Sequence, residues 1–173
     1  LLFNTNNDSD DEIVENDSMV EEEVVNIRMI EFLSGVGGMR ISLEKALRLL
    51  NNDKGTSKRT FVLESCRTYD ISVHANNVYK HNFLNNSSSN ESSNSKEVCT
   101  KLVEQLKPCD VAPCRANLWT MSPPCQPFTT SGEGQRKDEE DNRCNGLKGI
   151  CRLLNEVKTK PRWIFLENVQ GFA

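Results

Sequence analysis

An apolar run that passes directly into glycines and then into a helical pattern is the most constraining feature of this sequence. Residues 24–33 form an apolar run of strand length, and residues 34–39 read Ser-Gly-Val-Gly-Gly-Met. Apolar residues then recur on one helical face, at Leu43, Ala46, Leu47 and Leu50. Strand, glycine turn and helix make the first unit of a nucleotide-binding α/β sheet, because glycines allow a ligand to approach closely and the helix N-terminus offers free N–H groups. The third glycine of the G-x-G-x-x-G pattern is missing, so a plain tight turn is the alternative.

A second strand is expected within residues 61–70, although its register is unclear from the sequence. In nucleotide-binding sheets, an acid at the end of this strand binds the ribose hydroxyls, typically about 20 residues past the glycines. Glu64 and Asp70 are both candidates, and both lie later than that spacing. Spacing alone does not choose between them, and either is equally well read as a solvated surface charge.

A proline-bracketed cysteine follows another short apolar run. Residues 117–121 predict a strand, and residues 122–127 read Ser-Pro-Pro-Cys-Gln-Pro. Proline fixes φ and keeps its predecessor out of the helical region, so this segment is a stiff extended turn. Such a turn presents the Cys125 thiol at a strand end, as a nucleophile is presented. A buried structural cysteine is the alternative, since free cysteine is among the most buried residue types.

The remaining pattern predicts helices over residues 73–83, 98–106 and 146–157, a loop over 108–115 and a strand over 162–166. In a parallel sheet, ligands bind outside the carboxyl ends of the strands. The glycine turn, Asp70, Cys125 and Glu167 all follow such ends. We therefore expect one sheet edge to gather a glycine cradle, a ribose acid, a thiol and a carboxyl. This combination suggests group transfer from a nucleotide-like cofactor.

Three polar segments are expected to lie outside the packed core. Residues 1–23 are rich in Asn, Asp, Glu and Ser and predict a disordered acidic arm. Residues 84–96 predict a low-complexity insertion within the domain that spans residues 24–173. Residues 130–142 are polar, charged and glycine-bearing, as a mobile active-site loop is.

Cysteine usage and charge restrict the class of protein. The seven cysteines are odd in number and no export signal is present, so we expect reduced thiols rather than disulfides. No Cys-x-x-Cys occurs and both histidines lie far from the cysteine clusters, so we expect no metal site. No apolar stretch is long enough to cross a bilayer, so we expect no membrane partner. A soluble protein of the cytoplasm is expected, with the nucleus as a second location.

Three segments resemble conserved motifs of the cytosine-C5 methyltransferases. Residues 32–39, 122–129 and 166–169 are similar to the family's first, fourth and sixth motifs, in the family's order. Each is weak alone, but Pro-Pro-Cys-Gln-Pro-Phe together with Glu-Asn-Val is highly specific. The resemblance runs from about Ile27 to the end of the sequence.

The same residues resemble one branch of that family. Ser34 before Gly-Val-Gly-Gly-Met, and Thr129 where Ser is usual, are similar to the tRNA(Asp) cytosine-C5 methyltransferases, which methylate an anticodon-loop cytosine and are historically grouped with DNA methyltransferases. Asp70-Ile71, followed by residues 75–80, is similar to the ribose-binding motif of this branch. The resemblance therefore favours Asp70 over Glu64.

The resemblance implies a Rossmann-like, S-adenosylmethionine-dependent methyltransferase fold. The implied cofactor-binding residues are Phe32, Ser34, Gly35, Val36, Gly37, Gly38, Asp70 and Ile71. Cys125 would add as a thiolate to C6 of cytosine, so that C5 can take the methyl group. Glu167 would bond or protonate N3, which requires a raised pKa in a dry pocket. The target base must leave its stack to reach the thiol.

Three functions remain open at this point. Methylation of a tRNA anticodon-loop cytosine is the expected one, and methylation of DNA cytosine is the first alternative. The second alternative is a catalytically inactive half-domain that binds only cofactor or a partner. In the family, the later part supplies a basic motif, a target-recognition region and a last helix, and we expect the fold to be incomplete at the C-terminus. The Lys and Arg residues are interleaved with acids and form no clear basic stripe.

Overall fold

The computed structural model describes residues 23–53, 59–84, 98–125 and 141–172. The predicted acidic arm lies outside the described residues except for Glu23, which begins the first strand. The predicted low-complexity insertion lies outside them except for Leu84, and so does most of the predicted active-site loop. Among the described residues, no helix has the length and apolar character needed to cross a membrane.

Five parallel strands form one sheet in the order β3-β2-β1-β4-β5. They are β1 (Glu23–Phe32), β2 (Arg59–Tyr69), β3 (Val98–Cys99), β4 (Leu118–Met121) and β5 (Trp163–Leu166). The chain moves outward from β1 to β3 and then returns to the other side of β1 as β4. This reversal between β1 and β4 is the point at which open α/β sheets bind ligands. The predicted α/β fold with a parallel sheet is confirmed.

One row of paired residues crosses the whole sheet at its carboxyl edge. Cys99 pairs with Tyr69, Tyr69 with Phe32, Phe32 with Met121, and Met121 with Leu166. Each of these residues is the last of its strand. All five strands therefore end at one level, and the turns that follow them start side by side.

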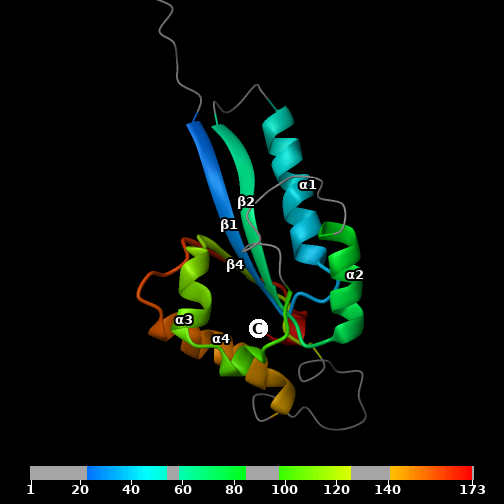
Figure 1. Ribbon diagram of the computed structural model, residues 1–173, viewed down its shortest axis with the longest axis vertical. Coiled ribbons are helices and arrows are strands. Elements are labelled where there is room, and N and C mark those ends of the chain that lie inside the picture. Colours follow the sequence, from blue (N-terminus) through cyan, green and yellow to red (C-terminus); the bar gives the residue numbers. More distant parts are fainter. Residues whose placement is uncertain (1–22, 54–58, 85–97, 126–140, 173) are drawn as a thin grey trace, which may run out of the picture.

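Helices cover both faces of the sheet, as Figure 1 shows. The helices are α1 (Gly38–Asn52), α2 (Val73–Phe83), α3 (Pro108–Val111) and α4 (Asn145–Glu156). Among the described residues, short 3₁₀ turns accompany them, namely η1 (Val103–Gln105), η2 (Ala112–Cys114), η5 (Asn142–Cys144) and η6 (Gln170–Phe172). In Figure 1, α1 and α2 lie on one side of the strands, and α3 and α4 lie on the other.

The main hydrophobic core lies between the sheet and α4. Buried strand residues meet Ile150 and Leu153 of α4 there. The Phe32 ring stacks on Tyr69 at 5.6 Å between ring centroids and meets Trp119 edge-on at 5.1 Å. These rings belong to β2, β1 and β4, so the core fixes the strands that carry the ligand edge.

Two element predictions are wrong. Residues 98–106 do not form a helix, because Val98 and Cys99 pair with the end of β2 before η1 begins. Residues 108–115 are not a plain loop, because α3 and η2 lie within them. Pro108 suits the first turn of a helix, and the Asp110 carboxylate accepts a hydrogen bond from the Lys107 N–H at 2.7 Å.

One helix-face prediction also needs correction. Within α1 only Leu47 is buried, and Leu50 is 53 % exposed. Asn51 hydrogen-bonds the backbone of Phe61, near the amino ends of β1 and β2. Strand β4 starts only opposite Met29, so this end of α1 has only β1 and β2 beneath it. In α4, Ile150 and Leu153 face the core, whereas Cys151 is exposed.

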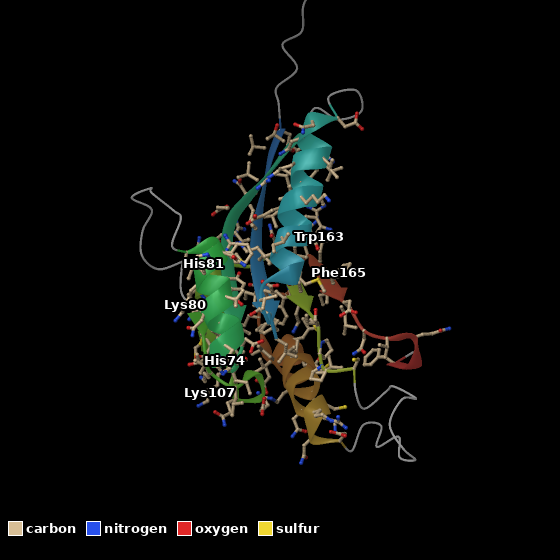
Figure 2. All side chains as sticks on the ribbon, turned by 90° about the vertical axis from the view of Figure 1, so that its right-hand side faces the viewer. His74, Lys80, His81, Lys107, Trp163 and Phe165 are labelled. Atoms are coloured by element: carbon tan, nitrogen blue, oxygen red, sulfur yellow. The ribbon has the colours of Figure 1, made fainter. Side chains whose placement is uncertain are left out.

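Strand β5 is only partly covered. It forms one end of the sheet order, and its four apolar side chains are between 37 % and 54 % exposed. Trp163 and Phe165, labelled in Figure 2, are two of them. Parallel sheets are normally covered on both faces. The described residues leave none of the four side chains of β5 buried.

Candidate active site

The predicted site residues converge on the carboxyl edge of the sheet. The Ser34 N–H donates to the Tyr69 carbonyl at 3.3 Å, and the Glu167 N–H donates to the Met121 carbonyl at 3.0 Å. These two bonds tie each turn to the end of the neighbouring strand. Cys125 lies four residues after Met121, as a half-buried free thiol. The fold thus brings the glycine turn, the strand-end acid, the thiol and the carboxyl to one edge.

The glycine turn is shaped by alternating left-handed residues. Leu33, Gly35 and Gly37 have φ of 55°, 53° and 92°. A Cβ at Gly37 would lie 2.4 Å from the Phe83 ring, because the turn packs directly against α2. A Cβ at Gly35 or Gly38 would meet nothing within 4 Å, so the opposite side of the turn is open. A ligand can therefore approach the backbone on that side.

Asp70 connects two turns. Its Oδ2 accepts a hydrogen bond from the Gly35 N–H at 2.7 Å, and its Oδ1 accepts one from the Ser72 N–H at 2.8 Å. Each carboxylate oxygen has a further lone pair, so Asp70 can still accept bonds from ribose hydroxyls. Glu64 lies where the β1–β2 register shifts and pairs with Arg28 at 3.1 Å. Of the two candidate acids, Asp70 alone follows the end of β2.

The other implied cofactor residues have different surroundings. Val36 and Ile71 are 50 % and 58 % exposed and offer apolar surface close in sequence to the glycine turn and to Asp70. Ser34 is buried, and its Oγ has no hydrogen-bond partner in the described part of the chain. The Phe32 ring is fully buried in the core, so its side chain supports the turn from below. Phe32 could therefore contact a ligand only through its backbone atoms.

The thiol and the carboxyl follow adjacent strands. Pro123 is buried and Pro124 is half-buried, so both anchor the turn that holds Cys125. Glu167 directly follows β5, and its side chain is exposed, so the described residues do not form the dry pocket expected around it. The next residue, Asn168, accepts a hydrogen bond at Oδ1 from the Val169 N–H, while its buried Nδ2 has no partner among the described residues. The two groups thus follow neighbouring strands, which lie about 4.8 Å apart.

Glu31 is a buried acid behind the candidate site that the sequence analysis did not single out. Its side chain is 1 % exposed, and its Oε2 accepts a hydrogen bond from the Tyr79 hydroxyl at 3.4 Å. That hydroxyl also accepts one from Arg40 at 3.4 Å and lies 3.5 Å from the Cys66 thiol. The network joins β1, β2, α1 and α2 behind the glycine turn. The sequence feature that could have indicated this residue is that Glu31 is the single acid within the apolar run of residues 24–33.

Burial controls the electrostatics of this network. It raises the pKa of Glu31 to about 7, although the N–H groups of Arg40 and Met39 and the Tyr79 hydroxyl act to lower it. Burial also raises the pKa of the Cys66 thiol to about 11. The pKa of the Tyr79 phenol is raised above its ordinary range, again mainly by burial. The network is therefore most stable with its acids protonated.

We expect Glu31→Gln to change how stability depends on pH. The pKa of Glu31 is higher in the folded protein than the ordinary 4.5, so its stabilisation is complete below pH 4.5 and is lost as pH rises through about 7. The rise corresponds to roughly 3 kcal/mol. Urea unfolding at pH 5 and pH 8 should show this loss in the wild type and a smaller loss in the variant. Equal losses of stability in the wild type and the variant would show that Glu31 is not the source of this pH dependence.

Metal ligation finds no support in the described part of the chain, where no group of three or more His, Cys, Asp or Glu side chains could hold an ion. The polar groups around the glycine turn are instead backbone N–H groups and the Asp70 carboxylate, next to apolar surface, which suits an adenosine-bearing ligand.

The chain is similar in sequence to known methyltransferases. The model of a family described as C-5 cytosine-specific DNA methylase matches residues 27–173. A DNA (cytosine-5)-methyltransferase of Dictyostelium discoideum is 36 % identical over 85 % of this chain and 32 % of its own length. A tRNA (cytosine(38)-C(5))-methyltransferase of Rattus norvegicus is 31 % identical over 84 % of this chain and 31 % of its own. The chain thus spans about a third of the length of these curated relatives.

The fold has solved counterparts. The structure of the Entamoeba histolytica methyltransferase EhMeth has a TM-score of 0.60 and 32 % identity, covering 87 % of this chain and 39 % of that one. The Schizosaccharomyces pombe Dnmt2 methyltransferase has a TM-score of 0.56 and 28 % identity, covering 86 % and 36 %. Both support a Rossmann-like arrangement of the sheet.

Proposed function

Because the chain belongs to the C-5 cytosine-specific DNA methylase family, we propose that it serves S-adenosylmethionine-dependent methylation of cytosine at C5. The observation that carries the proposal is the common strand edge, where the glycine turn, Asp70, Cys125 and Glu167 follow neighbouring strand ends. The relatives are about three times as long as the match. We therefore propose this activity for the chain when it is joined to a segment equivalent to the part of the relatives that lies outside the match.

The edge fits the proposed cofactor. S-adenosylmethionine supplies an electrophilic methyl group when it is bound. The cofactor would approach the backbone of the glycine turn from its open side, and Asp70 would accept hydrogen bonds from the ribose of the cofactor. The exposed Val36 and Ile71 would cover apolar parts of the ligand. The unpartnered Ser34 Oγ is a further polar contact that a ligand could satisfy.

The protein residues would prepare the cytosine. C5 of cytosine is a weak nucleophile, and addition of the Cys125 thiolate to C6 moves an electron pair of the C5–C6 double bond toward C5 and N3. Glu167 would hold a proton at N3 and so neutralise the charge that accumulates in the ring. After C5 has taken the methyl group, the N3 proton would return to Glu167. Loss of the C5 proton to water, with departure of the Cys125 sulfur from C6, would then restore the aromatic base and the free thiolate.

RNA is the preferred substrate in this proposal. Relatives named for tRNA methylation and one named for DNA methylation match over nearly the same share of the chain. Ser34 and Met39, both in or next to the glycine turn, favour the tRNA branch. Thr129 favours it too, although it lies outside the described residues. Cytosine in a single-stranded loop is also cheaper to withdraw from its stack than cytosine in a duplex.

We expect RNA to be methylated faster than DNA. The test extends this chain by the part of the Dictyostelium relative that lies beyond the matched residues. Radiolabelled methyl transfer is then measured on matched stem-loops of RNA and DNA. We expect a preference for RNA of roughly tenfold or more, corresponding to about 1.4 kcal/mol in barrier height.

Two outcomes would change this conclusion. A reversed preference would assign the chain to DNA. Cofactor binding without transfer to either stem-loop, while the unmodified relative is active, would support a half-domain that only binds cofactor or a partner.

A further inference from the structure

A cavity lies at the opposite end of the sheet from the candidate active site. Its volume is about 760 Å³, within the range of small-molecule sites. It is bordered by segments that lead into β4 and β5, including Ala116 and Thr159, and by Arg28 of β1. Because the strands are parallel, these amino-end segments lie away from the edge that carries Cys125.

The floor of the cavity is apolar and well supported. Its apolar lining consists of Val111, Ala112, Ala116, Trp119 and Val157. Val111, Trp119 and Val157 also belong to the main hydrophobic core. A ligand here would therefore contact residues of the packed core, and an apolar body would gain by leaving water.

The rim of the cavity is cationic. Arg28, Arg115 and Lys158 border it, together with the acid Glu156. Glu156 lies 3.7 Å from Arg152, and Arg28 is paired with Glu64, so those charges are balanced locally. The side chains of Arg115 and Lys158 are exposed and form no ion pair with any described residue. The cavity thus has an apolar floor and two positively charged side chains, Arg115 and Lys158, that are not paired with a described acid.

We propose that this cavity binds an organic anion, namely a carboxylate on an alkyl or aryl body. The apolar floor would take the body, and Arg115 and Lys158 would face the carboxylate. Arginine is well suited to this role because its planar group can bond a carboxylate through two N–H donors. The proposal does not depend on the methyltransferase reaction, since none of the cavity residues follows the carboxyl end of a strand.

Decanoate is the probe that tests it. The chain contains two tryptophans, Trp119 and Trp163, so Trp163→Phe leaves the cavity residue Trp119 as the only fluorescent indole. We expect decanoate to change this fluorescence in a saturable way, and decanol and decylammonium to bind more weakly. Reversing both rim charges, in Arg115→Glu with Lys158→Glu, should weaken decanoate binding by about tenfold or more. Lys45→Glu, an exposed change on α1, is the matched control and should leave binding unchanged.

Cysteine labelling gives an independent readout. Cys109 is exposed and borders the cavity, whereas Cys151 is exposed but does not. Decanoate should slow alkylation of Cys109 by iodoacetamide and leave that of Cys151 unchanged. Equal binding of decanoate and decanol, unchanged binding after charge reversal, or equal protection of both thiols would overturn the proposal. If circular dichroism shows that the double reversal is unfolded, Arg115→Gln with Lys158→Gln replaces it, with the same weakening expected.

Discussion

Replacing Cys125 by alanine should abolish covalent capture of a target RNA. The assay uses the extended chain and a stem-loop with 5-fluorocytosine at the target position. Fluorine at C5 replaces the proton that must leave after methyl transfer, so the thiol cannot depart from C6 once C5 is methylated. With S-adenosylmethionine present, the wild type should therefore form an adduct that survives a denaturing gel. Alanine has no nucleophilic atom, so the adduct should fall to background. Methyl transfer to ordinary RNA should fall by at least about three orders of magnitude, as removal of a covalent nucleophile does elsewhere.

Two other cysteines provide matched controls. Cys151 is exposed, so Cys151→Ala should leave capture intact and alter stability by less than about 0.5 kcal/mol. Cys144 is buried, so Cys144→Ala should also leave capture intact while lowering stability by about 1 kcal/mol. An adduct that survives Cys125→Ala, or that maps to a different cysteine, would show that the nucleophile is misassigned.

Replacing Gly37 by valine should abolish binding of S-adenosylhomocysteine. The φ of 92° is unfavourable for any residue with a Cβ, and the added atom would lie 2.4 Å from Phe83 and 2.9 Å from Tyr79. Either the turn or α2 must move, which deforms the proposed cradle. We expect stability to fall by about 3 kcal/mol or more, since overpacking and left-handed strain add together. Calorimetry with S-adenosylhomocysteine and urea unfolding measure the two effects.

Gly38→Ala separates the cradle from the fold. Gly38 begins α1 with an ordinary φ, and a Cβ there meets nothing within 4 Å. Alanine should therefore preserve stability or raise it by up to about 1 kcal/mol. Its methyl group would stand on the open side of the turn, so affinity should still fall. Equal affinity of the wild type and Gly37→Val would remove the cofactor proposal, and undiminished affinity of Gly38→Ala would place the ligand on another side of the turn.

Local patterns in the sequence were sufficient for most of the secondary structure. The helix over residues 73–83 was predicted with the bounds of α2, and the strand predicted over residues 117–121 begins one residue before β4 and ends with it at Met121. The strand–glycine–helix unit was also predicted, and so was the convergence of the glycine turn, Asp70, Cys125 and Glu167 at strand ends. These features depend on periodicity and on proline and glycine geometry, which act over a few residues.

Tertiary contacts decided what local patterns could not. Residues 98 and 99 form a strand only because β2 offers them partners, and Leu50 is exposed because few strands lie beneath that end of α1. Gly37 must be glycine because of Phe83, which is distant in sequence. Glu31 acquires its raised pKa from burial among α1, α2 and β2. Burial, strand pairing and close packing are properties of residues that meet across the fold, so no window of neighbouring residues contains them.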